Sequence, residues 1–214
     1  RADLNGPMRA GRASDDPRLR AAQPTIAELA DKGAIVLVLS HFGRPKGESA
    51  EFSLSPISSV LAKVLGRTVG FVTECKGPAA EQAVGLMAPG EIAVLENTRF
   101  EAGEEKKDPA PVPGIAKLGG PYVNAAFPAA HRAHASTEGL AHVLPAYAGR
   151  SMQAELEHLE AALGDPERPV AAVVGGAKVS SKLDVLNDLV GKVDHLIIGG
   201  GMANTFLAAR GVDV

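Results

Sequence analysis

Strand-like apolar runs and helical patterns alternate along most of this chain, and this alternation limits the possible folds more than any other feature. The unbroken apolar run at 34–40 predicts a strand buried on both faces, as strands of parallel sheets are. Further strands are predicted at 69–73, 92–95, 122–126, 170–174 and 195–198, and helices at 19–32, 55–65, 79–88, 152–163, 181–189 and 202–210. This order favours an α/β fold with a doubly wound parallel sheet, a Rossmann-like three-layer α/β/α arrangement.

The alternation is interrupted twice, and these interruptions define the predicted domains. Pro109, Pro111 and Pro113 and the charge run 104–107, which has no apolar face, predict a surface loop over most of 101–121. The charged amphipathic helix at 152–163 predicts a connection between two domains. We therefore expect a first domain at 1–150, an inter-domain helix at 151–166 and a second domain at 167–214 that is truncated after two strands.

Composition restricts the class of function. The formal net charge is -3, and no long basic run is present, which argues against general nucleic-acid binding. No apolar run approaches the roughly 20 residues that a spanning helix needs, and the first residues do not resemble a secretory signal. Cys75 is the single cysteine, which excludes an intrachain disulfide and fits a reducing compartment. Because the chain has no long basic run, any anion binding must depend on a few basic residues at one place.

Arginines recur next to the predicted strand ends. Arg44 lies with His41 and Lys46 in the turn 41–47 directly after the strand 34–40, while Arg99 and Arg132 follow later strands and Arg18 follows two aspartates. The carboxyl ends of parallel strands meet at one edge of a sheet, where such folds bind ligands. A guanidinium binds phosphate or carboxylate through a planar fork. Taken by itself, the turn 41–47 is better explained as a solvated polar loop, but a solvated loop explains four arginines at similar positions less easily.

Two glycine clusters mark the second region. Gly175 and Gly176 precede two lysines, and 199–201 is a run of three glycines after the next predicted strand. Such turns let the backbone approach a phosphate at a helix N-terminus, although a tight strand-to-helix turn is an equal explanation for each. The sequence has no GxxxxGK[ST], GxGxxG or GxSxG, and His131 and His134 lack further zinc ligands, so we predict no metal site among these residues.

Several blocks together resemble the phosphoglycerate kinase family, in family order and along essentially the whole chain. These blocks are RADLNGP, SDDPRLRAA, SHFGRPKG, LENTRF, AHRAHAST, PERPVAAVVGGAKVSSK and IIGGGMANTF. The resemblance implies a two-domain kinase of glycolysis that exchanges a phosphoryl group between 1,3-bisphosphoglycerate and ADP. It also implies a cytoplasmic monomer without nucleic-acid or membrane partners.

The resemblance also implies roles for individual residues. The matching positions for the acid substrate are Asp3, Asn5, Arg18, His41, Phe42, Gly43, Arg44, Arg99 and Arg132, and those for ATP or ADP are Gly176, Lys178, Lys182, Gly199 and Gly200. Arg18 and Lys182 are expected to contact the transferred phosphoryl group. The Mg²⁺ ligand of the family is expected beyond Val214, and the first strand before Arg1.

The chain departs from the family pattern at several positions. Ala125 stands where aspartate is common, Gly6 where valine is common, and Pro128 replaces a small residue. We expect the chain as it stands to be an incomplete fragment that does not turn over. Two other interpretations remain open, a non-catalytic binding or scaffold homologue with a degenerate site and a plain nucleotide-binding domain.

Overall fold

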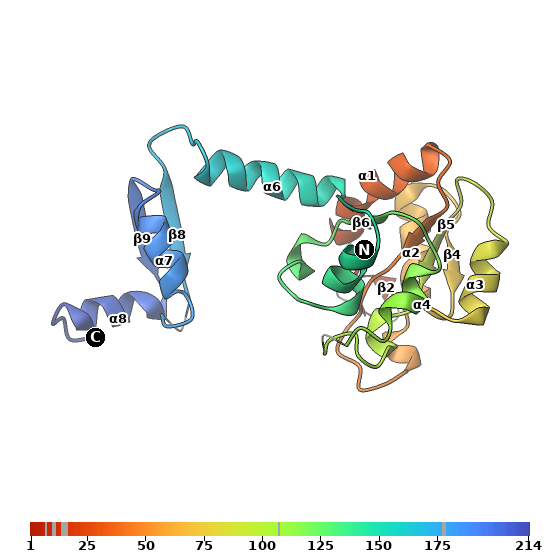
Figure 1. The fold of residues 1–214 in the computed structure, drawn as a ribbon. Coiled ribbons are helices and arrows are strands. Elements are labelled where there is room, and N and C mark those ends of the chain that lie inside the picture. The colour runs from red at the N-terminus through yellow and green to blue at the C-terminus, as the bar shows by residue number, and fades with distance from the viewer. Residues whose placement is uncertain (7, 10–11, 14–16, 107, 177–178) are drawn as a thin grey trace. The chain divides into compact units, whose positions relative to one another are not determined.

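The computed structural model describes residues 1–6, 8–9, 12–13, 17–106, 108–176 and 179–214 (Figure 1). The chain forms two compact units, Arg1–Ala154 and Glu155–Val214. The boundary falls inside the helix α6 (Arg150–Leu163). Each unit is described separately.

A parallel sheet forms the centre of the first unit. Its strands are β3 (Val36–Val38), β5 (Ile92–Leu95) and β4 (Gly70–Val72), in the order β3-β5-β4. Both pairings are parallel, as the alternation predicts. β5 has the predicted bounds and is buried at every position, whereas β3 is shorter than the predicted 34–40 at both ends, and Ile35 before it is 40% exposed.

Residues Arg1 and Ala2 connect this sheet to a second parallel pair, β6 (Tyr122–Asn124) and β7 (Ala146–Ala148). The Ala2 amide donates to the Leu39 carbonyl at 2.9 Å, and Ala2 forms a parallel bridge with Ala125. The Ala125 amide donates to the Arg1 carbonyl at 2.9 Å. The N-terminal residues therefore lie between the ends of β3 and β6 and are joined to both by backbone hydrogen bonds.

Helices cover both faces of the sheet of the first unit. They are α1 (Pro17–Asp31), α2 (Ser55–Leu65), α3 (Pro78–Gly85), α4 (Val112–Ala116) and α5 (Leu140–Val143). Val36 and Val94 pack in one core cluster with α1 and α2, whereas Ala93 and Leu95 pack in another with α3, α4 and α5. Successive strand residues point to opposite faces, so this division gives the predicted three-layer α/β/α arrangement.

The predicted surface loop at 101–121 is partly wrong. Pro111 precedes α4, and prolines in a first helical turn lose no intrahelical hydrogen bond, so this segment can form a short helix. Val112 and Ile115 of α4 are buried. Glu104, in the charge run, is only 1% exposed. This carboxylate is buried because it receives hydrogen bonds from a distant serine, which periodicity cannot reveal.

Several short elements were not predicted. They are the hairpin of β1 (Met8–Arg9) and β2 (Arg12–Ala13), the 3₁₀ turns Ala50–Phe52, Thr98–Phe100 and Phe127–Ala129, the π-helical segment Ala135–Gly139, and the pair α5 and β7. Each of these elements has five residues or fewer. Such lengths are too short to show a hydrophobic period.

The second unit contains the parallel pair β8 (Ala171–Gly175) and β9 (His195–Gly199) with the helices α7 (Leu183–Val190) and α8 (Gly201–Ala209). These elements lie within about two residues of their predicted bounds. Leu186 and Met202 are buried, but Val173 and Ile197 on the strands are 74% and 52% exposed. The described part of this unit therefore leaves apolar strand side chains uncovered.

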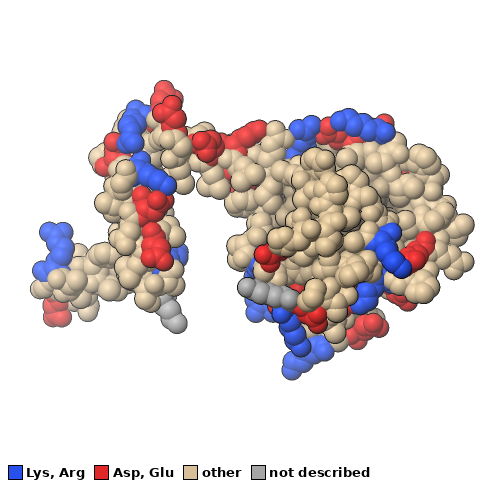
Figure 2. Space-filling model, in the orientation of Figure 1, with Lys and Arg blue, Asp and Glu red and all other residues tan. Residues whose placement is uncertain are grey.

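Acidic and basic side chains are interspersed on the face of the molecule that Figure 2 shows. This distribution agrees with the small net charge of -3. Among the described residues, the structure contains no helix with the length and apolar character needed to cross a membrane.

Candidate anion-binding site

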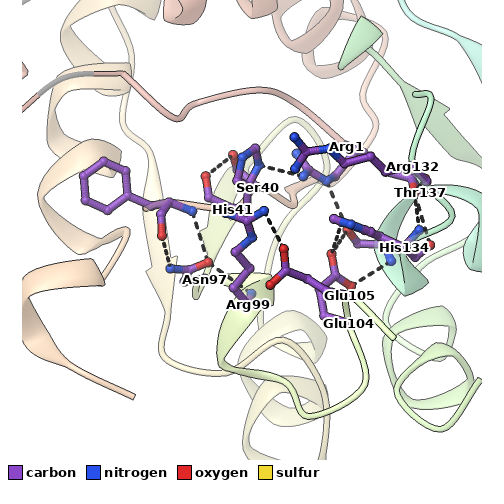
Figure 3. Close-up of polar contacts among 12 residues, drawn as sticks. Arg1, Ser40, His41, Asn97, Arg99, Glu104, Glu105, Arg132, His134 and Thr137 are labelled. Carbon is purple, nitrogen blue, oxygen red and sulfur yellow. Dashed lines mark hydrogen bonds and ion pairs between the residues drawn. The ribbon is translucent and has the colours of Figure 1, made fainter. Parts of the chain in front are cut away.

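The side chain of Asn97, which follows β5, forms hydrogen bonds to the basic turn 41–47 after β3 (Figure 3). The Asn97 side chain accepts a hydrogen bond from the Phe42 amide at 3.1 Å and donates to the Phe42 and Phe52 carbonyls at 2.8 and 2.9 Å. Asn97 is 1% exposed. The neighbouring parallel strand thus fixes the backbone of the turn, as expected where strand ends meet.

The N-terminal segment supplies the next side chains. Asn5 Oδ1 accepts a hydrogen bond from the Gly43 amide at 2.9 Å, and the Asn5 amide donates to Asp3 at 3.2 Å. Asp3 forms an ion pair with Arg18, whose side chain is half exposed. These contacts bring Asp3, Asn5 and Arg18 to the turn.

The side chain of Arg99, one of the predicted arginines, is buried, with 5% of it exposed. Its guanidinium donates to the Gly43 carbonyl and pairs with Glu105 at 2.6 Å. Its Nε is buried and has no hydrogen-bond partner among the described residues. A buried donor without a partner is costly, so this atom marks a position where an added acceptor would be stabilised.

His41 lies among cationic groups and is held neutral. Burial and, in decreasing order of effect, the charges of Arg1, Arg99, Arg132 and His134 together lower its pKa to about 3. Its Nδ1 lies 2.9 Å from Arg1 Nη2 and, in the neutral ring, can accept that hydrogen bond. The same positive charges that oppose protonation of His41 would favour a bound anion.

Glu104 and Ser136 are buried next to Arg1 of this cationic group. Ser136 donates to Glu104 through its amide at 2.9 Å and its hydroxyl at 2.5 Å, and it accepts a hydrogen bond from Arg1 Nε at 3.1 Å. His134 Nδ1 lies 3.9 Å from Glu104. Burial lowers the pKa of His134, whereas the Glu104 charge opposes this effect.

The structure brings most of the predicted acid-site residues into one connected group. Gly43 joins Asn5 to Arg99 through its amide and carbonyl, and His41 contacts Arg1. Arg132 is half-buried and donates to His131 at 3.3 Å. Arg44 is exposed on the same turn.

An apolar cavity of about 450 Å³ also lies in the first unit. Its lining includes Ile26 of α1, Val36 of β3 and Leu118, and it shares Arg1 with the connected group. Nearly all of its walls are apolar, so it offers little to a phosphate or carboxylate. We therefore place anion binding at the arginine group and not in this cavity.

In the second unit, the glycine turns allow close backbone approach. A Cβ on Gly175 would lie 3.4 Å from the Gly199 carbonyl oxygen, and Gly176 and Gly200 adopt φ of +145° and +65°. The Lys182 ammonium donates to the Gly175 carbonyl at 2.7 Å. Lys178, predicted to bind nucleotide phosphate, lies outside the described residues. The predicted residues Gly176, Lys182, Gly199 and Gly200 thus lie around one pair of strand ends.

The described residues contain no group of three or more histidine, cysteine, aspartate or glutamate side chains that could hold a metal ion. Magnesium nucleotide is the usual substrate in the family that the sequence resembles. None of the described residues forms a site for this ion, so we derive no step through it.

Sequence reasoning missed four polar residues of the site. Arg1, Asn97 and Ser136 stand inside the quoted blocks RADLNGP, LENTRF and AHRAHAST, so the blocks contained a signal for them. Glu104 had no such signal because it belongs to a charge run that is typical of surface loops. Its burial depends on contacts across 32 residues of sequence.

The fold and the site together define an α/β protein with a group of cationic side chains at the carboxyl edge of a parallel sheet, an arrangement suited to binding a small anion. The family model for phosphoglycerate kinase matches residues 1–214. The chain therefore belongs to the phosphoglycerate kinase family.

Individual relatives agree with this assignment. The phosphoglycerate kinase of Rhizorhabdus wittichii is 70% identical over 215 residues, and that of Zymomonas mobilis is 69% identical. The solved structure of phosphoglycerate kinase from Coxiella burnetii is 40% identical with a TM-score of 0.87. Each comparison covers the whole of this chain but 54% of the relative, so the chain spans about half the length of these relatives.

Proposed function

We propose that the full-length protein carrying this chain is an active phosphoglycerate kinase. It transfers the acyl phosphoryl group of 1,3-bisphosphoglycerate to ADP and releases 3-phosphoglycerate and ATP, in the cytoplasm and as a monomer. The observation that carries this proposal is the cationic group at the edge of the sheet, where Arg1 lies 2.9 Å from His41 and Arg99 donates to the Gly43 carbonyl of the same turn. Such a group can bind a three-carbon acid that carries both a carboxylate and a phosphate.

The proposed division of labour follows the two parts of the chain. Residues 1–150 bind the acid through Asp3, Asn5, Arg18 and the turn at 41–44, together with Arg99 and Arg132. Residues 151–166 connect the domains, and residues 167–214 begin the nucleotide domain. The glycine turns and Lys182 support phosphate binding there, because backbone amides at helix N-termini and a lysine favour anions.

The chemistry requires charge stabilisation more than proton transfer. An oxygen of the ADP β-phosphate forms the new bond to phosphorus while the bond from phosphorus to the carboxylate oxygen breaks, so the carboxylate leaves with the electron pair. The attacking phosphate oxygen is already deprotonated, and the departing carboxylate is a stable anion, so neither a general base nor a general acid is needed. Arg18 and Lys182 are proposed to stabilise the negative charge on the transferred group.

A coupled ATP-formation assay on the full-length protein tests this proposal. Arg18→Ala should lower kcat about a hundredfold or more, the effect expected when one donor to a transition-state charge is lost. Arg67→Ala is the matched control, because Arg67 pairs with Asp31 at the surface of the same unit. We expect it to retain wild-type turnover.

The outcomes separate the competing interpretations. Absence of ATP formation by the wild-type protein would favour a non-catalytic homologue. Normal turnover by Arg18→Ala would refute the role assigned to Arg18. Titration with 3-phosphoglycerate should also shift the NMR signals of His41, and a lack of any shift would argue for a plain nucleotide-binding domain.

A further inference from the structure

Glu104 is a buried carboxylate that lies behind the cationic group and has no assigned role. It is 1% exposed, and it comes from the turn that follows Thr98–Phe100. Its carboxylate receives both the amide and the hydroxyl of Ser136, at 2.9 and 2.5 Å. A buried carboxylate is stabilised only by such donors and by nearby positive charge.

The contact with Glu104 fixes how Ser136 uses its hydroxyl. A serine has one O–H donor, and here it is directed at Glu104. The hydroxyl oxygen is therefore left as an acceptor, and Arg1 Nε donates to it at 3.1 Å. Ser136 is 0% exposed, and Tyr122 donates to its carbonyl at 3.0 Å, so the serine cannot easily change position.

Ser136 in turn orients Arg1 toward the site. The Arg1 guanidinium donates through Nη1 to the Ala2 carbonyl and lies with Nη2 2.9 Å from His41 Nδ1. Burial lowers the pKa of Arg1, and the charge of Glu104 is the largest effect that opposes this lowering. The carboxylate thus stabilises the charge of Arg1 and, through the serine, its direction (Figure 3).

We propose that Glu104 is a positioning residue that acts through Ser136 to hold the Arg1 guanidinium against His41 in the acid site. Glu104 itself does not touch the substrate. We call the contacts from Glu104 through Ser136 to Arg1 the relay. This inference rests on the proposed function, because the relay is assigned to binding of the acid and not of the nucleotide.

The test uses steady-state kinetics of the full-length protein with 3-phosphoglycerate and ATP. Glu104→Gln removes the charge, and Ser136→Ala removes the hydroxyl while Glu104 keeps its bond to the backbone amide. Both should raise the KM for 3-phosphoglycerate about tenfold, the loss expected for one hydrogen bond to a charged group. The KM for ATP should stay within about twofold of wild type.

Two further variants separate positioning from general stability. Ser136→Thr keeps the hydroxyl and should restore a KM for the acid close to wild type. Glu138→Gln lies in the same π-helical segment, where Glu138 is exposed and 3.6 Å from His142, and it should change neither KM. A merely structural role for Glu104 would lower thermal stability without raising one KM selectively.

A selective rise in the acid KM supports the proposal, and an unchanged acid KM in both Glu104→Gln and Ser136→Ala overturns it. If Glu104→Gln does not fold, Ser136→Ala alone decides. If the wild-type protein has no turnover, the proposed function fails separately. The relay is then tested by the Kd for 3-phosphoglycerate, measured from the His41 NMR signals. This Kd should rise about tenfold in Ser136→Ala, and an unchanged Kd would overturn the proposal.

Discussion

Replacing Asn97 with alanine should destabilise the first unit strongly. The Asn97 side chain makes four hydrogen bonds to backbone groups, to the Phe42 amide and carbonyl, the Phe52 carbonyl and the Arg99 amide, at 2.8–3.1 Å. At about 1 kcal/mol net for each bond, and somewhat more where a buried group is left without a partner, the loss is about 3–5 kcal/mol. This is a large share of the 5–15 kcal/mol that stabilises a typical domain.

Native-state hydrogen exchange of the full-length protein measures this loss where it occurs. Peptides covering β3 and β5 should exchange about a hundredfold faster or more in Asn97→Ala. Asn187→Ala is the matched control, because Asn187 is exposed on α7 of the other unit and should change the exchange rates of β3 and β5 little. If these strands exchange within about threefold of wild type in Asn97→Ala, the amide does not hold the turn as we describe.

Three other substitutions and one titration test the same structure. Gly66→Ala should lower the free energy of unfolding by about 1 kcal/mol, because Gly66 ends α2 with φ +67° and has open space around it. Gly43→Ala should lower it more, because the added Cβ would lie 2.3 Å from the ring of Phe52. Urea unfolding measures both losses. Leu61→Ala should cost about 2–5 kcal/mol in the same assay, since Leu61 is 0% exposed in the core. The pKa of His41 is lowered from 6.5 to about 3, so the unfolded chain binds a proton that the folded chain does not, and stability should fall as pH drops from 6.5 toward 3. An NMR titration of His41 with a midpoint near 6.5 would contradict this assignment.

The long periodic elements could be predicted because their signals are local. α2 was predicted at its observed bounds, since Pro56 fits the first turn and Gly66 adopts the left-handed conformation that ends the helix. β5 was predicted at its observed bounds because it is apolar throughout and buried on both faces. The family resemblance was not needed for either element.

The segment 101–121 could not be predicted in the same way. Its prolines and charges have the composition of a surface loop, and this composition does not show which charge finds a partner after folding. Glu104 is buried only because Ser136 provides two donors. The π-helical segment that carries Ser136 spans five residues and has no sequence period of its own. Long-range pairing therefore decides the local structure here.

The convergence of basic residues at one sheet edge was predicted in outline from topology. Parallel strands bring the turn after β3 and the segment after β5 to one edge, so His41 and Arg99 were expected to lie near each other. The sequence did not indicate how deeply each arginine is buried. Arg99 has a 5% exposed side chain, whereas Arg44 is exposed on the same turn as His41.

The net charge of -3 and a cationic site are compatible because the positive charges of the site are balanced by nearby acidic side chains. Glu105 pairs with Arg99 directly, and Glu104 balances Arg1 through Ser136. His41 adds no charge, because it stays neutral among the arginines. A fully charged, unpaired group of this kind would oppose folding, since buried charges without partners are costly. The arrangement keeps this cost low, and within the part of the chain that the structure describes it leaves the buried Arg99 Nε without an acceptor.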